Sequence, residues 1–385
     1  MNQFFAKRQK ASVQHAHQPS GMATGTFALA AVATAGIGGA WVLQQVHVPA
    51  PWLVGPLVVA MLWRSFGPAT PGVPQWLQRA ASALLGANLA ENVTPQVLQT
   101  LQEALGGALS TVLVLLAASV GTGLLFARLA RMDPITGVLS FLPGAASAVV
   151  ALSRDLRADP RLVSTLQYLR LTIVVLAAPF AASLLASAGL SPDLDGSLPA
   201  PDPALSIMGR DTGPEGLLSH ALTWGSVLLG LWVGRTLVLP AATLLVPMTL
   251  LVTAGALGYP GATISPWFIT AAFVVVGMWA GLQFDRPAIV RAGKAALWAV
   301  PLVFALILVS GLSALLLSQV SGIPLVTTFL ATAPGGLEAM VATSLDLGAD
   351  AALVLSIQLL RFLVVLVTAP FVAHRLSGAS RDRQA

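Results

Sequence analysis

Side chains that could do chemistry are scarce in this sequence, and the densest group lies in the stretch APGGLEAMVATSLDLGAD, from Ala333 to Asp350. It carries three carboxylates, Glu338, Asp346 and Asp350, with no basic residue among them. An acid among apolar residues inside a membrane indicates an ion or proton path by default. Because Glu338 follows a Pro-Gly-Gly break, it would also lie in the first turn of a helix, where a negative charge is favourable. The sequence leaves both roles open.

The same motif occurs earlier in the chain. Pro143 and Pro334 are 191 residues apart, and at this offset half of the positions between Pro143 and Phe180 are identical to their counterparts. The identical pairs include Pro143/Pro334, Gly144/Gly335, Asp155/Asp346, Asp159/Asp350, Gln167/Gln358, Arg170/Arg361 and Pro179/Pro370. An apolar composition alone could align Ala, Leu and Val, but it would not align Pro, Asp, Gln and Arg together. The sequence therefore predicts an internal duplication. Glu338 is not duplicated, since its counterpart is Ser147.

Each copy contains a Gln-x-x-Arg pair inside an apolar segment. Three residues separate Gln and Arg, so both lie on one face of a helix. The arginine is about 12 Å from the helix start at 1.5 Å per residue. The candidate partners are Asp155 and Asp346, Asp159 and Asp350, or a bound anion. Structural ion pairs that lock each Pro-Gly segment to its helix are the alternative.

The two Pro-Gly segments, 137–153 and 328–345, are the candidate functional elements. Pro removes a backbone donor and Gly tolerates unusual backbone angles, while the next helix begins with unpaired N–H groups and a partial positive charge. Ten to fourteen apolar residues are too few for a full crossing, so we predict two re-entrant hairpins; two ordinary kinked helices are the alternative. The candidate substrate or ion ligands are Pro143, Gly144, Ser147, Gln167, Arg170, Pro334, Gly335, Gly336, Glu338, Gln358 and Arg361. The structural or ion-pair candidates are Asp155, Asp159, Asp346 and Asp350.

The composition indicates that these elements lie in a membrane. The chain is 56% hydrophobic and only 9% charged, whereas a soluble domain carries about 25% charged residues. Apolar runs such as Ala104–Ala127 and Leu353–Ala373 exceed the roughly 20 residues that cross a bilayer. We therefore expect an all-α polytopic membrane protein.

Five membrane helices are expected in each unit. In the first unit they span 24–45, 49–66, 78–94, 104–128 and 162–187; in the second they span 216–236, 240–257, 266–283, 294–318 and 353–374. The second and third helices of each unit are short and contain Pro or Gly. The expected organisation is a cytoplasmic tail at 1–23, a first repeat at 24–187, an acidic Pro/Gly/Ser-rich linker at 188–215, a second repeat at 216–376 and a C-terminal tail at 377–385.

The basic residues predict the orientation. With the N-terminus in the cytoplasm and five crossings per unit, seventeen of the twenty Lys and Arg residues fall on the cytoplasmic side, as the positive-inside rule requires. The second unit then enters from the opposite side, so the units are expected to be inverted repeats. Arg154, Arg157 and Arg161 have no basic counterparts in the second copy, which inversion explains. Twelve full crossings in parallel repeats would explain this loss less well.

Several classes of function are disfavoured. The chain has no cysteine, which excludes disulfides, thiolate zinc sites and iron–sulfur clusters. Its five histidines form neither an HExxH motif nor a two-His-one-carboxylate set at workable spacing. The basic residues form no stripe that would bind nucleic acid; the cluster at Lys7, Arg8 and Lys10 is better interpreted as a topology signal. We expect no enzymatic activity, no metal, no cofactor and no direct nucleic-acid partner.

The duplicated pattern Pro-Gly…Asp-Leu-x-Ala-Asp…Gln-x-x-Arg…Ala-Pro-Phe resembles the bacterial AbrB-type membrane family, which has an internal duplication. The resemblance covers roughly residues 24–376. Members of that family carry the labels ammonia monooxygenase or AbrB family transcriptional regulator. The first label implies a copper or iron site, for which the sequence shows no ligand set. The second implies a DNA-binding element, which is not apparent, or an indirect effect on gene expression.

The leading expectation for function is a secondary transporter that couples movement of a small solute to an H⁺ or Na⁺ gradient. Paired segments interrupted by Gly or Pro, at corresponding positions of inverted repeats, are typical of such proteins. A membrane protein that regulates gene expression is the alternative, and an ammonia monooxygenase comes third. The expected partners are the lipid bilayer and a small-molecule or ion substrate, with a homodimer left open. The expected location is the bacterial inner membrane, with both termini in the cytoplasm.

Overall fold

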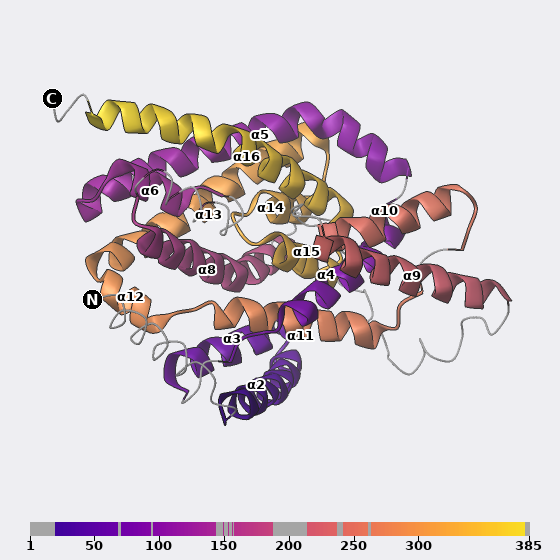
Figure 1. Cartoon of the computed structure of the whole chain (residues 1–385). Helices are drawn as coiled ribbons and strands as arrows, with labels where there is room; N and C mark the ends of the chain where they lie inside the picture. Colours follow the sequence, from indigo (N-terminus) through magenta and orange to yellow (C-terminus); the bar gives the residue numbers. More distant parts are fainter. Residues whose placement is uncertain are drawn as a thin grey trace, which may run out of the picture.

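The computed structural model is a bundle of α-helices (Figure 1). It describes residues 20–67, 71–93, 95–143, 158–187, 214–236, 242–260 and 263–381, together with residues 149, 153 and 156. No strand occurs among these residues, so the predicted all-α class is confirmed. Gly144, Ser147 and Asp155, most of the predicted N-terminal tail and most of the predicted linker lie outside the described residues.

A helix occurs at each of the ten places where the sequence predicts one. The first unit contains α2 (Ser20–Gln45), α3 (Pro51–Phe66), α4 (Gln75–Leu89), α5 (Pro95–Ala130) and α8 (Pro160–Ser187). The second contains α9 (Pro214–Thr236), α10 (Ala242–Ala256), α11 (Pro266–Leu282), α13 (Lys294–Ser321) and α16 (Ala351–Arg381). The helix predicted at 78–94 ends at Leu89 and is followed by the 3₁₀ turn η2 (Ala90–Asn92). The short helix α12 (Arg286–Ala292) was not predicted, because so few residues give no membrane-length apolar signal.

Within the part of the chain that the structure describes, five of these helices, α2, α5, α8, α9 and α13, are long and apolar enough to cross a membrane. The helices α3, α10 and α11 are apolar but have only 16, 15 and 17 residues, fewer than the roughly 20 that a crossing requires. The helix α4 is similarly short, with 15 residues. These four are the second and third helices of each unit, which the sequence predicts to be short.

Each Pro-Gly segment begins with a short helix that stops at the proline. In the first unit this helix is α6 (Pro134–Phe141), where the Asp133 carboxylate accepts hydrogen bonds from the first turn. In the second unit, α14 (Leu325–Thr332) and α15 (Leu337–Asp346) flank the break. They have 8 and 10 residues, or about 12 and 15 Å at 1.5 Å per residue. Neither helix alone would span a hydrocarbon core of about 30 Å.

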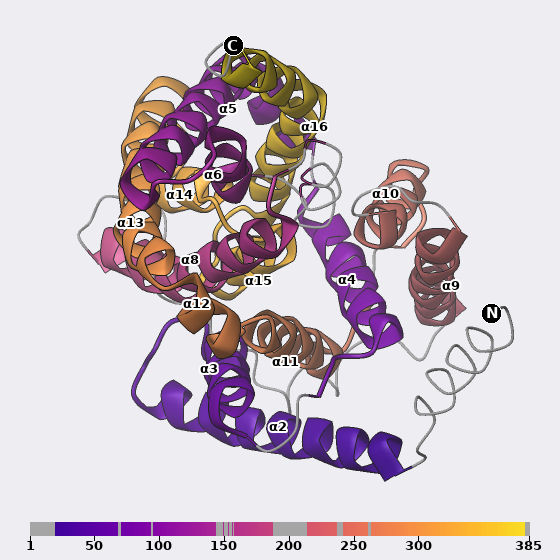
Figure 2. The ribbon, with the colours of Figure 1, turned by 60° about the vertical axis from the view of Figure 1, so that its left-hand side comes forward.

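The helices form two bundles that each draw on both units (Figure 2). One, here called the frame bundle, contains α2, α3 and α4 of the first unit with α9, α10 and α11 of the second. The other, the hairpin bundle, contains α5, α6 and α8 with α13, α14, α15 and α16. Among the described residues, helix contacts are concentrated within each bundle, and α12 together with the edges of α3, α4, α8, α11 and α15 makes most of the contacts between the two.

Two close contacts between the units are reciprocal. A Cβ on Gly86 of α4 would lie 2.0 Å from the carbonyl oxygen of Leu244 on α10, and one on Gly277 of α11 would lie 2.2 Å from that of Leu53 on α3. These two contacts are equivalent at the 191-residue offset. One turn beyond Gly277, Gly281 also faces the backbone of α3, at Leu57. From the first contact to the second, the residue number rises by four on both helices, so α3 and α11 run in the same direction.

Replacing Gly277 with Ala should therefore destabilise the protein. The added methyl group would overlap the α3 backbone, and overpacking of this kind costs about 1–3 kcal/mol. Thermal denaturation of the purified chain in detergent should show a lower Tm. A methyl group added to Gly225 on α9 would have no heavy atom within 4 Å, so Gly225→Ala is the matched control and should not lower the Tm. An unchanged Tm for Gly277→Ala would contradict the close packing of α3 and α11.

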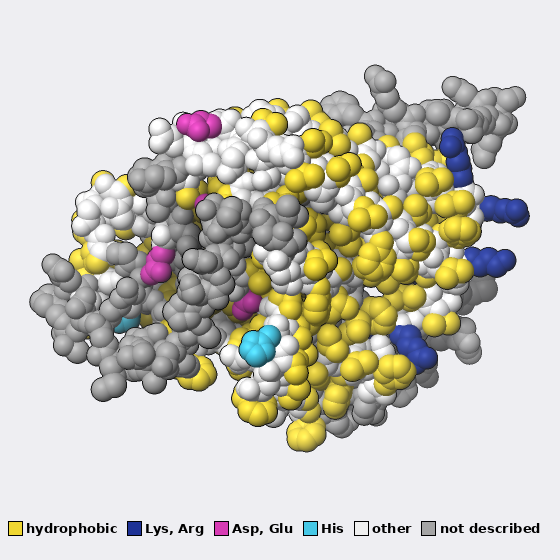
Figure 3. Space-filling model, turned by 180° about the vertical axis from the view of Figure 1, so that it is seen from behind, with side chains coloured by type: hydrophobic (Ala, Val, Ile, Leu, Met, Phe, Trp, Pro, Cys, Tyr) yellow, Lys and Arg dark blue, Asp and Glu magenta, His cyan; other side chains and the backbone are white. Residues whose placement is uncertain are grey.

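Many large apolar side chains are exposed on the surface of the protein. On α13 alone, Leu308, Leu312 and Val320 are 74%, 63% and 81% exposed. Figure 3 shows Lys and Arg side chains gathered at one edge of a largely apolar face, with Asp, Glu and His side chains toward the other side. An apolar belt with bases at one rim is the surface expected of a protein in a bilayer.

Candidate functional site

In the first unit, two side chains of α8 form hydrogen bonds with the end of the short helix α6. Gln167 donates through Nε2 to the carbonyl oxygens of Leu139, at 2.7 Å, and Leu142, at 3.0 Å. Arg170 donates to the carbonyl oxygen of Phe141, at 2.8 Å, and to the Gln167 side-chain oxygen, at 2.9 Å. Gln167 and Arg170 are both buried. The side chains of one helix thus replace the backbone partners that the end of α6 lacks.

The second unit repeats this arrangement. Gln358 of α16 donates to the carbonyl oxygen of Leu330, at 2.9 Å. Arg361 donates to the carbonyl oxygens of Ala333, at 2.7 Å, and Gly335, at 3.5 Å, and to the Gln358 side-chain oxygen. The duplicated Gln-x-x-Arg pairs therefore hold the two Pro-Gly breaks at their backbone carbonyls.

The partners of these arginines among the described residues are carbonyls, where the sequence led us to expect carboxylates or an anion. The carboxyl-terminal ends of α6 and α14 carry partial negative charge, which offsets the positive charge of each guanidinium. Arg170 and Arg361 are close enough for their charges to repel, so this compensation matters. One of the expectations was that structural ion pairs lock each Pro-Gly segment to its helix. The arginines do connect the segment to the helix, but they bind carbonyl oxygens and not carboxylates.

The described aspartates have structural contacts of their own. Asp350 accepts hydrogen bonds from the backbone N–H groups of Ala352 and Leu353, both at 3.0 Å, and so caps α16. Asp159 caps α8 in the same way. Asp346 faces the backbone N–H of Ala50, at the start of α3. Each satisfies otherwise unpaired donors at a helix start.

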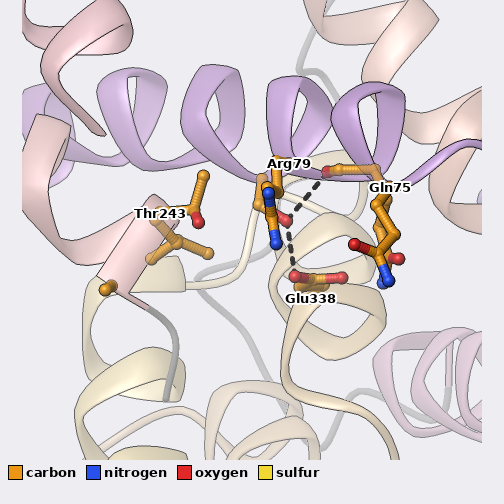
Figure 4. Close-up of a pocket in the computed structure, with 8 residues that line it drawn as sticks. Gln75, Arg79, Thr243 and Glu338 are labelled. Carbon is orange, nitrogen blue, oxygen red and sulfur yellow. Dashed lines mark hydrogen bonds between the residues drawn. The ribbon is translucent and has the colours of Figure 1, made fainter. Parts of the chain in front are cut away.

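Glu338 lies apart from these pairs, in the first turn of α15. The Ser82 hydroxyl of α4 donates to its Oε1 at 2.5 Å and also lies 3.1 Å from the carbonyl oxygen of Gln78. Glu338 borders a cavity of about 290 Å³. The lining residues are Gln75, Gln78, Arg79, Ser82, Ala242, Thr243, Leu244 and Glu338. In Figure 4, Arg79 points from α4 toward Glu338 on α15.

This cavity, here called the Glu338 pocket, lies between the two bundles. Its walls come from α4 and α10 of the frame bundle, and Glu338 comes from α15 of the hairpin bundle. The charged residues of the pocket have no charged counterparts in the other half of the duplication. At the 191-residue offset, Gln78, Arg79 and Ser82 correspond to Ile269, Thr270 and Phe273.

Sequence reasoning missed the α4 wall of this pocket. Gln75, Gln78, Arg79 and Ser82 follow the spacing i, i+3, i+4, i+7, which places them on one face of a helix. A polar stripe on a short helix in an apolar chain was the available signal. Its position opposite Glu338 could not be read from the sequence, because residues 82 and 338 are brought together only by packing between the units.

Within the described residues, no group of three His, Cys, Asp or Glu side chains is placed to hold a metal ion. In the Glu338 pocket, one carboxylate, one guanidinium, two amides and two hydroxyls converge. Such a set can bind a small polar or charged solute or exchange a proton at Glu338.

Comparisons with known proteins agree on one family. A family model described as "Transition state regulatory protein AbrB" matches residues 2–121 and 77–377. The chain is similar to "Putative regulator AbrB" of Escherichia coli (strain K12), with 31% identity over 345 residues, 88% of this chain and 94% of that protein. It is also similar to "Uncharacterized protein YhjN" of Bacillus subtilis (strain 168), with 25% identity over 366 residues, 90% of this chain and 93% of that protein. The chain belongs to the AbrB family, as the duplicated motif indicates.

Proposed function

We propose that this protein is a secondary transporter of the bacterial inner membrane, which couples movement of a small polar solute to an H⁺ or Na⁺ gradient. The observation that carries the proposal is the Glu338 pocket, in which polar groups from both bundles surround a carboxylate in an apolar chain. In transporters built from internal repeats, substrate and ion sites lie where the repeats meet, next to interrupted helices. The position of Glu338 in the first turn after the break before α15 supports this assignment.

Inverted repeats are part of the proposal, and the direction of α3 and α11 supports them. These are the second helix of one unit and the third helix of the other. Successive helices of one unit run antiparallel if both cross the membrane, so in parallel repeats α3 and α11 would run in opposite directions. They run in the same direction, because Gly277 faces Leu53 and Gly281 faces Leu57.

The two bundles suggest how access would alternate. Rigid-body rocking of one bundle against another around a fixed site is the usual mechanism in such folds. A site between the bundles changes its exposure when they move. In the predicted orientation, α4 and α10 both begin at the cytoplasmic side, so the pocket lined by their first turns would open to the cytoplasm in this state.

Flux measurements on the reconstituted chain test the proposal. Proteoliposomes would carry an imposed pH or Na⁺ gradient, and radiolabelled amino acids, sugars, amines and carboxylic acids would be supplied outside. We expect at least one solute to accumulate against its own gradient and to leak out again when an ionophore collapses the ion gradient. Correctly folded protein that moves none of these solutes under either gradient would contradict the proposal.

Regulation of gene expression is the second candidate, because the similar Escherichia coli protein is named a regulator. Transcript profiles of cells that carry Glu338→Gln at the native locus distinguish the two. If regulation follows from transport, the variant should reproduce the profile of a deletion strain. If regulation is independent of transport, the variant should keep the wild-type profile.

A further inference from the structure

We propose that the Glu338 pocket binds a small zwitterion, an amino-acid-sized molecule with one ammonium and one carboxylate group. Glu338 would bind the ammonium group and Arg79 the carboxylate. The proposal rests on the proposed transport function and specifies its substrate class.

The first argument is charge. Arg79 and Glu338 reach the same cavity from different helices, and Arg79 makes no hydrogen bond or ion pair with another described residue. The hydrogen bond to Glu338 comes from the neutral Ser82 hydroxyl. A partly enclosed charge favours a partner of opposite sign. A simple cation would leave Arg79 without a partner of opposite charge, and a simple anion would leave Glu338 without one. A zwitterion offers an oppositely charged partner to each of the two side chains.

The second argument is geometry. The Ser82 bond occupies Oε1 of Glu338 and orients the carboxylate, while the second oxygen can accept from an ammonium group, which has three donors. A guanidinium presents a planar fork that matches a carboxylate. Gln75, Gln78 and Thr243 add amide and hydroxyl groups around these charges. The polar walls thus offer both donors and acceptors.

The third argument is size. The cavity volume of about 290 Å³ is at the small end of ligand sites, which span roughly 300–1,000 Å³. Ala242 and Leu244 supply the apolar part of the lining, enough for a compact side chain. We therefore expect amino acids with small side chains to bind best.

Binding to the purified full chain tests this assignment with L-alanine and L-serine as probes. The matched analogues are N-acetyl-L-alanine, which lacks the ammonium group, and L-alaninamide, which lacks the carboxylate. Competition against a radiolabelled probe should show that each analogue binds about 30-fold or more weakly than L-alanine, the factor expected from leaving one partner of an enclosed charge pair alone.

Two variants assign each contact. Glu338→Gln should abolish the preference for L-alanine over N-acetyl-L-alanine, and Arg79→Gln should abolish the preference for L-alanine over L-alaninamide. The matched controls are Glu103→Gln and Arg128→Gln, both at exposed positions on α5, and both should keep wild-type preferences. Absence of binding by both amino acids, or preferences that neither pocket variant alters, would overturn the assignment.

Failure of this assignment can be told apart from failure of the transport proposal. If L-alanine binds with the expected variant pattern but no solute moves under a gradient, transport is wrong and the chemistry of the pocket stands. If gradient-driven flux occurs only for amines or only for carboxylic acids, transport stands and the zwitterion is wrong.

Discussion

Replacing Glu338 with Gln should reduce gradient-driven flux about 30-fold or more, because Glu338 would lose its charge pair with the ammonium group of the proposed substrate. Loss of one member of an enclosed charge pair costs about 2 kcal/mol or more. Gln keeps the size and can still accept from Ser82, so the fold should survive while the negative charge is lost. Initial rates in proteoliposomes at equal protein content measure the effect. Ser82→Ala should also reduce the flux, since a hydrogen bond to a charged group contributes about 1.5–3 kcal/mol.

Glu103→Gln on the exposed face of α5 is the control, and its flux should equal that of the unmodified chain. Unchanged flux in Glu338→Gln would remove this carboxylate from the transport cycle. The role of Glu338 would then be confined to its helix start, where an acid is favourable for the α15 dipole.

Replacing Arg361 with Met should prevent stable folding. The Arg361 guanidinium contacts the carbonyl oxygens of Thr332, Ala333 and Gly335. Met preserves the apolar stem but leaves the carbonyl oxygen of Gly335 and the side-chain oxygen of Gln358 without a donor. The carbonyl oxygens of Thr332 and Ala333 keep hydrogen bonds from Ser310 and Gln358. Each buried unsatisfied group costs about 1–3 kcal/mol, so a loss of about 3 kcal/mol or more is expected. The yield of monodisperse protein in size-exclusion chromatography, and the Tm of any folded fraction, measure it.

The matched control is Arg128→Met, at an exposed position on α5, which should fold normally. Arg361→Lys should be intermediate, because one ammonium group lacks the planar fork of Arg and cannot replace all of its bonds. A Tm for Arg361→Met equal to that of the unmodified chain would show that the carbonyls at the break are satisfied without it.

The helices could be predicted from the sequence because their apolar runs and Pro or Gly breaks are local signals. The shortness of α3, α4, α10 and α11 followed from the same signals. The partners of Arg170 and Arg361 could not be predicted, because every residue has a backbone carbonyl and the residue type does not show which one accepts a hydrogen bond. The sequence showed that these arginines need partners, and we expected carboxylates or an anion.

The arrangement of the two units was harder to predict from the sequence. The duplication shows which helices correspond, but it does not show that α3 packs on α11 across the units or that α4 packs on α10. Those contacts decide which side chains face Glu338. The ligands contributed by α4 therefore emerged only from the packing, although their helical spacing is visible in the sequence.

Inverted repeats are the central claim, and the absence of cysteine allows one direct test with single-cysteine variants. Gly72, before α4, has open space around it, and Tyr259, before α11, is 51% exposed. Both precede the third helix of their unit, so inversion places them on opposite sides of the membrane. A membrane-impermeant maleimide should label Tyr259→Cys in intact spheroplasts and Gly72→Cys only after permeabilisation. Labelling of both variants from the same side would show that the repeats are parallel and would contradict the claim.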